Sequence, residues 1–353
     1  MIEDKIKEIS ELSFKAKNEK DESEKEKLET DVKELLMDLK KQAIESFKED
    51  SNIKKFLDNI ATFNNYSFNN QCLIWIQNPD AHYVASKTTY NKMGYDLKDG
   101  EYDKSLKILV PSFLNFVKIK LDNGKYEVKP FYMLNSEEQK KYKDKNDDSI
   151  TFHKKKLTHF SIGYVYDMNQ TTMPFDEIDS KLNPMLEDPK ADEIADIFIK
   201  AIYRDGFKVR YDKIENGAKG YCDFDSNEIV IADGLNNLMK LKVIIHEYAH
   251  SQAHKHLKEN KLDYKEHREK YETEAESIAY VVSKYLGFDT KDYSFIYLYG
   301  WSKNRDFEEI DDSFNAIVNY SKKIINNFEK MLEKNRNVVD ELYPNDYEVG
   351  ISI

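Results

Sequence analysis

The sequence has few cysteines and no long hydrophobic run. Only Cys72 and Cys222 occur in 353 residues, without a C-x-x-C pair, so no disulfide framework is expected and a reducing cytoplasm fits. No apolar run approaches the roughly 18 residues that a membrane-spanning helix needs. Residues 1–5 are too charged for a signal peptide. We therefore expect a cytoplasmic protein of two-domain size with no membrane partner.

Histidine is also scarce, and two of the eight histidines lie in one motif. Residues 246–250 read His-Glu-Tyr-Ala-His and follow an apolar run. Residues four apart share one face of a helix, so His246 and His250 are placed to hold one Zn²⁺ ion. Glu247 lies beside that face, where it can take a proton from water. The H-E-x-x-H pattern is typical of zinc peptidases, although a polar helix face with paired histidines would give the same pattern.

A zinc site needs a third protein ligand, and two further histidines follow the motif. His256 has the metzincin spacing, but Ala253 stands where that pattern needs glycine. His254 continues the same helical face, which places it a full turn too far from the ion.

An acidic helix offers the other candidates for the third ligand. Its apolar pattern ends at Gly287, and Glu272 and Glu276 share a face with Ala275 and Ala279. Because alanines are small, this helix can approach the histidine helix closely, and a carboxylate on it can reach the ion. A solvated acidic face is the alternative.

The second half of the chain resembles the gluzincin-type peptidases of the ImmA/IrrE and ArdC-like group. The resemblance rests on residues 229–235, on residues 241–250 and on the pattern E-x-x-A-E-x-x-A that begins at Glu272. It implies that Glu272 is the third zinc ligand. It also implies that Glu276, where the ImmA/IrrE form usually has Asn, orients a ligand histidine. Residues 293–301 resemble a Y-I-x-x-W segment of ArdC-like proteins.

The first half resembles the N-terminal domain of ArdC antirestriction proteins. Residues 66–79 carry the pattern Y-S-x-x-N-x-x-L-I-x-x-Q-x-P, and residues 164–171 resemble the strand that closes that domain. The resemblance implies binding of single-stranded DNA. The chain has a net charge of −12, but residues 51–165 hold 18 Lys against 13 Asp plus Glu. Single-strand binding needs positive charge and flat rings. The predicted DNA contacts are Tyr66, Asn70, Trp75, Gln77 and Tyr90. The alternative is that the rings are core residues and that the two amides satisfy buried backbone groups.

The expected fold class is α+β, with an α/β domain of the single-stranded-DNA-binding type before a gluzincin-like metallopeptidase domain with a small sheet and active-site helices. The expected divisions are a charged amphipathic helical segment (1–50), the ArdC-like domain (51–178) and the zincin-like domain (179–353). The first segment either packs on the next domain or forms a partner-binding arm. Residues 136–156 are expected to form a loop. The second domain should contain helices at 194–202 and 306–335 and strands near 209–211, 221–224 and 228–232, the last at the sheet edge beside the metal.

These features predict a zinc metallopeptidase with a single-stranded-DNA-binding domain, connected with antirestriction or mobile elements, that acts on a protein or peptide substrate. His254, Tyr297 and Tyr299 are the candidates for stabilising the oxyanion. One alternative is a protective DNA-binding protein whose zinc site is structural. Another is a regulatory protease that cleaves a repressor, as the ImmA branch implies. Glu247 favours chemistry, because binding alone does not need it.

Overall fold

The computed structural model describes residues 2–47, 50–121, 124–144, 147–174, 191–215, 217–255, 267–288 and 305–342. The helices are α1 (Ile2–Asn18), α2 (Glu22–Phe47), α3 (Asp50–Thr62), α4 (Phe68–Gln77), α5 (Lys87–Lys92), α6 (Ser136–Lys143), α8 (Ala191–Arg204), α9 (Asn237–Ala253), α11 (Arg268–Tyr285) and α13 (Phe307–Leu342). The strands are β1 (Val84–Ala85), β2 (Leu106–Lys120), β3 (Tyr126–Pro130), β4 (Ile150–Asp167), β5 (Lys208–Asp212), β6 (Gly220–Asp223) and β7 (Glu228–Ala232). Among the helices in these ranges, none combines the length and apolar character that a membrane crossing requires.

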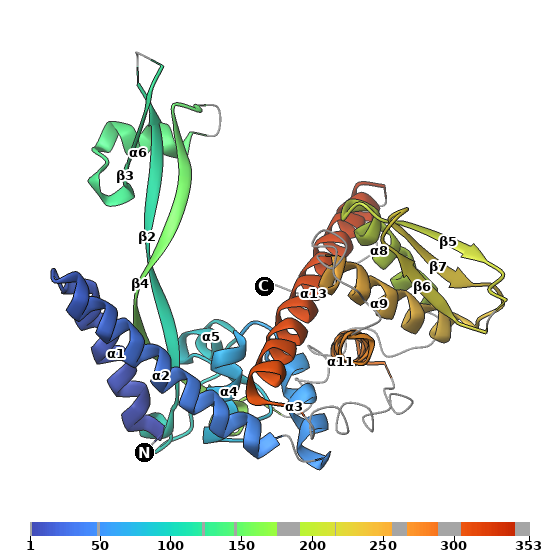
Figure 1. Ribbon diagram of the computed structural model, residues 1–353, viewed down its shortest axis with the longest axis horizontal. Coiled ribbons are helices and arrows are strands. Elements are labelled where there is room, and N and C mark those ends of the chain that lie inside the picture. Colours follow the sequence, from blue (N-terminus) through green and yellow to red (C-terminus); the bar gives the residue numbers. More distant parts are fainter. Residues whose placement is uncertain are drawn as a thin grey trace.

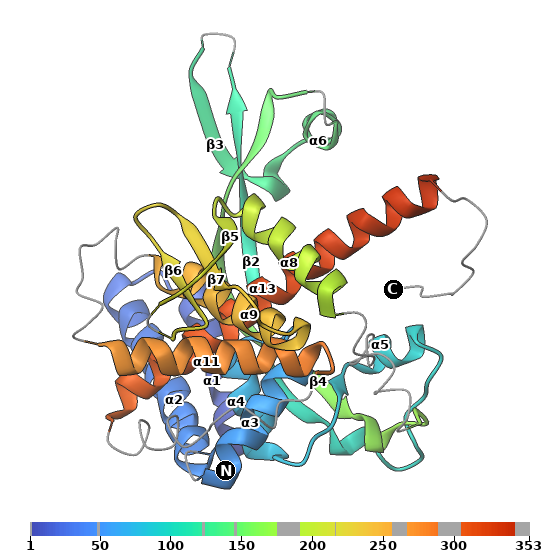
Figure 2. The ribbon, with the colours of Figure 1, turned by 90° about the vertical axis from the view of Figure 1, so that its right-hand side faces the viewer.

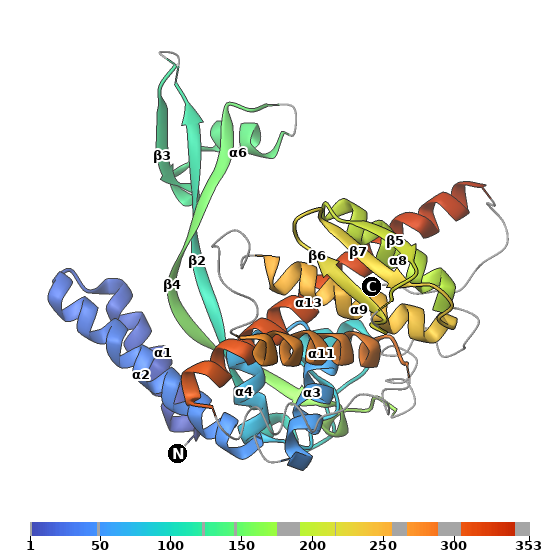
Figure 3. The same cartoon turned by 45° about the vertical axis from the view of Figure 1, so that its right-hand side comes forward.

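The first sheet extends into a long arm. Its strands are antiparallel in the order β1-β4-β2-β3, and β2 pairs with β4 from Leu106–Val165 to Ile119–Ile150. The β2–β4 pair rises out of the body and carries β3 and α6 at its far end (Figures 1 and 3). The predicted loop at 136–156 is wrong, because α6 and the start of β4 lie there. The Asn135 side chain and Glu138 form a capping box that starts α6, a signal present in the sequence.

The two N-terminal helices pack against the root of the arm, which decides between the two alternatives for residues 1–50. The Ser13 hydroxyl accepts the Phe160 backbone N–H at 3.0 Å and donates to the Phe160 carbonyl at 3.2 Å. Ile6 and Ile9 of α1 lie in one buried cluster with Leu109 of β2. The segment is therefore part of the folded body and does not stand apart as an arm.

The second sheet has the order β5-β7-β6, with β5 parallel and β6 antiparallel to β7. The predicted helices at 194–202 and 306–335 and all three predicted strands are present as α8, α13, β5, β6 and β7. The placement of residues 228–232 at the edge is wrong, because β7 is the central strand and its middle residues are buried. The edge strand against α9 is β6. A Cβ at Gly220 would lie 2.5 Å from Val243 Cγ1, so glycine permits this close packing.

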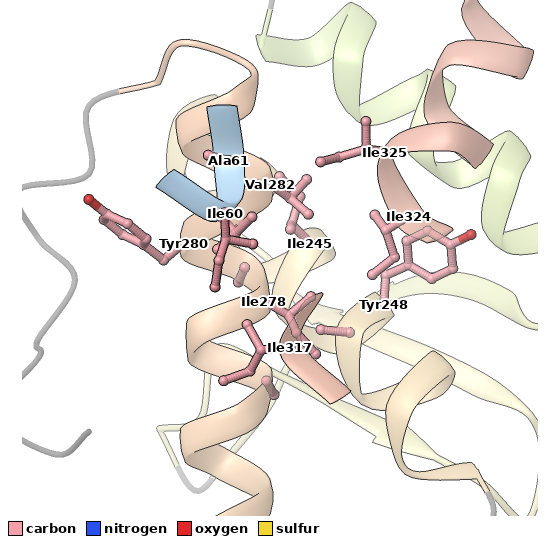
Figure 4. Close-up of a cluster of buried hydrophobic side chains, with 14 of the residues drawn as sticks. Ile60, Ala61, Ile245, Tyr248, Ile278, Tyr280, Val282, Ile317, Ile324 and Ile325 are labelled. Carbon is pink, nitrogen blue, oxygen red and sulfur yellow. The ribbon is translucent and has the colours of Figure 1, made fainter. Parts of the chain in front are cut away.

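One hydrophobic core joins the two halves of the chain. Helices α2, α3 and α4 contribute buried residues to the same cluster as α8, α9, α11 and α13. Figure 4 shows Ile60 and Ala61 of α3 beside Ile278 and Val282 of α11. In Figure 2, α11 lies between α3 on one side and α9 on the other. The predicted boundary after residue 178 therefore does not separate two cores.

We expect Phe56→Ala in α3 to destabilise the second half of the chain as well as the first half. Phe56 is fully buried, stacks on Phe47 at 3.9 Å between ring centroids and meets Phe314 of α13 edge-on at 5.7 Å. Removing such a ring costs about 3–5 kcal/mol of unfolding free energy. Denaturation followed by circular dichroism should give one shifted transition. Two transitions, of which only one shifts, would show that the halves unfold separately.

Candidate metal centre

Two neighbouring helices position the residues of the candidate site. The Asn236 side chain caps the start of α9 by accepting the Met239 backbone N–H at 2.9 Å. The second half of α9, which carries the H-E-x-x-H motif, is largely buried. On α11, Ala275 and Ala279 are fully buried and face the core shared with α9. These small side chains let the two helix backbones approach closely.

Three side chains converge on one point between α9 and α11. The Nε2 atoms of His246 and His250 are 3.2 Å apart, and each lies 3.6 Å from Oε2 of Glu272. In a tetrahedral zinc site with ligands at about 2.0–2.1 Å from the ion, neighbouring ligand atoms lie about 3.3 Å apart. The triangle of donor atoms thus has the size that one small divalent cation requires, and these three residues form the candidate metal cluster among the described residues.

The second ring nitrogen of His246 faces a carboxylate. Its Nδ1 lies 3.2 Å from Oε2 of Glu276, which leaves Nε2 directed at the ligand triangle. Burial acts to lower the pKa of His246, but the hydrogen bonds to Glu272 and Glu276 and the charge of Glu247 outweigh it and raise the pKa to about 10. An incoming cation must displace this proton, so metal binding is expected to release a proton and to weaken as the pH falls.

A longer relay orients His250. If Nε2 of His250 faces a cation, its Nδ1 carries the proton and donates to Nδ1 of His254 at 2.9 Å. The Nε2–H of His254 then donates to Glu274 at 3.1 Å, and Glu274 also accepts the Ser313 hydroxyl of α13. All the donors and acceptors of this relay are matched. Burial, with help from the neighbouring histidines, lowers the pKa of His250 to about 4, so this ligand is neutral before a metal binds.

Glu274→Gln should weaken metal binding by about tenfold, the lower end of the usual effect of such outer carboxylates. An amide can still accept the His254 proton, but it removes the negative charge that strengthens both imidazoles as bases. Metal affinity would be measured by competition with a chelating dye. Glu269→Gln is the matched control, because Glu269 lies on the same helix, exposed and paired with Arg305. Equal metal affinity in both variants would contradict the relay.

Glu247 lies beside the ligand triangle at the wall of a cleft. Burial raises its pKa to about 7, and the charge of Glu272 adds to this, whereas His246 and a hydrogen bond with the Cys222 backbone act to lower it. The cleft has a volume of about 360 Å³. Its lining residues are Lys219, Gly220, Met239, Lys242, Val243, His246, Glu247 and Glu276. A buried carboxylate with a pKa near neutrality, at an open cleft beside a metal centre, is suited to act as a general base.

The structure removes one oxyanion candidate. His254 is fully buried and both of its ring nitrogens are engaged, so it does not reach the cleft. Tyr297 and Tyr299, the alternative ligand His256 and the motif at 293–301 lie outside the described residues. Sequence reasoning missed Glu274. The sequence feature that could have indicated it is its position on the apolar face of α11, four residues before Ile278. No feature of the sequence pointed to Ser313 as a partner of Glu274.

Two of the three rings predicted to contact DNA lie in the interior, and the third is half-buried. Tyr90 is fully buried and its hydroxyl donates to the Tyr83 carbonyl at 2.9 Å. Trp75 is buried in the shared core, and its indole N–H donates to Ser46 at 2.8 Å. Tyr66 is half-buried and donates to the Val84 carbonyl at 3.1 Å. Because a ring must be exposed to stack on a base, the prediction is wrong for Tyr90 and Trp75, whose rings stabilise the fold. The hydroxyl of Tyr66 has a structural partner, and its role in DNA binding stays a prediction.

The two predicted amide contacts also have structural partners. Asn70 forms a two-way hydrogen-bond pair with the backbone of Leu109, at 2.9 and 3.0 Å. Gln77 pairs in the same way with the backbone of Lys107, at 2.9 Å in both directions. Both amides therefore attach α4 to β2. The alternative of satisfying buried backbone groups is the one that the structure shows.

The match with a known family lies in the first half of the chain. Residues 22–160 match the N-terminal domain of the anti-restriction factor ArdC. The ArdC match begins at the first residue of α2, ahead of the predicted domain start at residue 51, and ends inside β4. It contains the whole of β2 and residues 150–160 of β4. It does not reach α9 or α11, which carry the candidate metal ligands.

The uncharacterized protein pXO2-81 of Bacillus anthracis is 24% identical over an alignment of 349 residues, which covers 90% of this chain and 56% of that protein. The chain thus spans about half the length of this curated relative. Two crystal structures of the antirestriction ArdC protein from the R388 plasmid are also similar. The metal-free structure shows 13% identity and a TM-score of 0.38 over 77% of this chain and 86% of that one. The Mn(II)-bound structure shows 14% identity and a TM-score of 0.40 over 75% and 84%.

Proposed function

We propose that this chain is a zinc-dependent metallopeptidase of the cytoplasm whose ArdC-type N-terminal half binds single-stranded DNA, in an antirestriction or mobile-element setting. The observation that supports the enzymatic part is the triangle of donor atoms from His246, His250 and Glu272 with Glu247 beside it. Two neutral imidazoles and one carboxylate are a usual ligand set of catalytic zinc, which keeps a fourth position open.

The positions of the residues around the ligand triangle indicate their roles in the proposed reaction. A bound Zn²⁺ ion supplies Lewis acidity, which makes water acidic near neutral pH and polarises a carbonyl group. Glu247 accepts the proton of the attacking water and returns it to the leaving amine. Glu276 and the His254–Glu274 pair hold the two imidazoles in orientation. The edge strand β6 borders the cleft through Gly220, where an extended peptide backbone can pair with it.

The enzymatic part is tested with the purified full chain and a proteome-derived peptide library. After loading with zinc, with manganese or with no metal, new peptide termini are identified by mass spectrometry. We expect cleavage by the zinc-loaded chain, loss of cleavage with 1,10-phenanthroline, and recovery when zinc is restored. A metal-loaded chain that binds DNA but produces no new termini would support the binding-only alternative, in which the metal site is structural.

A further inference from the structure

The middle of the arm is a bare two-stranded ribbon. It consists of residues 110–117 of β2 paired with residues 152–161 of β4, which we call the ribbon. With 18 residues, β4 runs for about 60 Å. Helix α1 covers only the lower end, where Ser13 bonds Phe160. Above that contact the ribbon stands away from the body (Figures 1 and 3).

The arm is held in shape at its far end. Val117, Ile119, Leu134 and Ile150 form a separate buried cluster there, with Phe131 and Tyr142 packed against it. Lys129 of β3 and Glu138 of α6 are joined by an ion pair at 2.7 Å. A hairpin with its own small core is a fixed structure, so the side chains along the ribbon have defined positions.

The charge of the arm is opposite to that of the chain. Strands β2 and β4 together carry six lysines and a single acidic residue, Asp167, which is buried at the root. Lys154, Lys155 and Lys156 are consecutive and exposed, and within the described ranges no carboxylate pairs with them. In a chain with net charge −12, such a run without counter-charges favours an anionic partner.

Aromatic rings lie among these lysines. Phe113 and Phe152 are 45% and 55% exposed, although large apolar side chains normally avoid water. The Lys155 ammonium lies 4.5 Å from the centre of the Phe113 ring, and Lys154 lies 5.9 Å from that of Phe116. Ten of the sixteen exposed large hydrophobic residues of the described chain fall between residues 106 and 167. The ribbon therefore combines exposed lysines, which have no carboxylate partner in the described ranges, with exposed aromatic rings.

We propose that the ribbon is the surface that contacts single-stranded DNA. Because side chains alternate along a strand, Lys155 lies on the same face of the ribbon as Phe113 and Phe152, and Lys154 and Lys156 lie on the opposite face. A single strand that passes around the narrow ribbon meets both faces. The lysines neutralise its backbone phosphates, and the two rings stack on unpaired bases. The single strand is favoured over the duplex because paired bases are already stacked and offer no free face to a phenyl ring. This inference rests on the proposed DNA-binding function and gives it a location different from the interior side chains that the sequence pointed to.

The test uses the full chain, a fluorescently labelled 30-nucleotide oligo(dT) and a mixed-sequence duplex of equal length, with affinity followed by anisotropy from low to high salt. The triple variant K154Q/K155Q/K156Q removes three phosphate contacts. At about 0.7 per contact, the slope of log affinity against log salt should become shallower by about 2. The double variant F113A/F152A should lose about tenfold or more in affinity with the slope unchanged.

The control K323Q/K330Q/K334Q makes the same change of net charge at exposed lysines of α13 and should bind as the wild type does. Circular dichroism and zinc content verify that each variant is folded. Wild-type affinity in both ribbon variants, alongside binding by the wild type, would overturn the ribbon assignment and leave the proposed function standing. Stronger binding of duplex, lost in the same variants, would overturn the single-strand assignment. No binding by the wild type would overturn both.

Discussion

Replacing Glu272 by alanine is expected to reduce bound zinc from one ion per chain to almost none. Glu272 supplies the only carboxylate oxygen in the described ligand triangle, 3.6 Å from both imidazole nitrogens. Without it, two histidines on one helix remain, and water must complete the coordination. The side chain is 43% exposed and has no place in the core, so the fold should persist. Metal content would be measured by plasma mass spectrometry after dialysis.

Glu276→Ala is the matched variant, since it removes the same side chain four residues further along the same face. Glu276 meets the outer nitrogen of His246 and does not enter the triangle. We expect it to keep stoichiometric zinc with an affinity lowered by about 10- to 100-fold. The opposite outcome, with zinc kept in Glu272→Ala and lost in Glu276→Ala, would mean that the two carboxylates exchange roles.

Glu247→Gln is expected to keep the metal and the fold but to lower peptide cleavage by about 10²- to 10⁴-fold. The amide is almost the same size as the carboxylate, yet it cannot accept a proton at neutral pH. In the wild type, turnover should rise with pH as Glu247 ionises. Its pKa is raised by burial to about 7 without a cation, and a bound cation lowers it, so the rise should be centred at or below pH 7.

The pH profile separates a base from a merely structural residue. Residual activity in Glu247→Gln should no longer show this rise, whereas a packing defect would lower the whole profile and leave its shape. Cys222→Ser is a useful control, since it changes the side chain of the strand residue whose backbone bonds Glu247 and keeps that backbone. Unchanged turnover in Glu247→Gln would rule out the general-base role.

The local part of the site was readable from the sequence because it depends on helix geometry alone. The spacing of His246 and His250 fixes a common face, and the alanines at 275 and 279 predicted a close second helix. Both features are present in the structure. The choice of Glu272 over Glu276 came from resemblance to a family, since both carboxylates occupy the same face of α11. Only the positions of the two helices distinguish them.

The parts that were missed depend on contacts between distant segments. The edge strand beside the site is β6, because strand order is set by the packing of the whole sheet and not by the apolar character of residues 228–232. Tyr90 and Trp75 are residue types that could stack on bases. They are buried because β4 and α2, which are distant in sequence, pack against them. The helix at 136–143 is a different case, since its capping box was visible and was outweighed by the polar composition.

The two strands of the arm leave and re-enter the body at neighbouring points, which allows the arm to change during evolution. Beyond the paired residues Phe113 and Leu157, the described part of the arm contributes to no hydrophobic cluster except its own. A genetic insertion or deletion there can lengthen the arm, shorten it or exchange it for a tight turn without opening a cavity below. Helix α3, in contrast, shares its core with α9 and α11, which carry the candidate metal ligands. Recombination between relatives must therefore keep α3 together with these two helices. Under the proposed function, nucleic-acid specificity can thus vary at the arm while the metal site in the body stays unchanged.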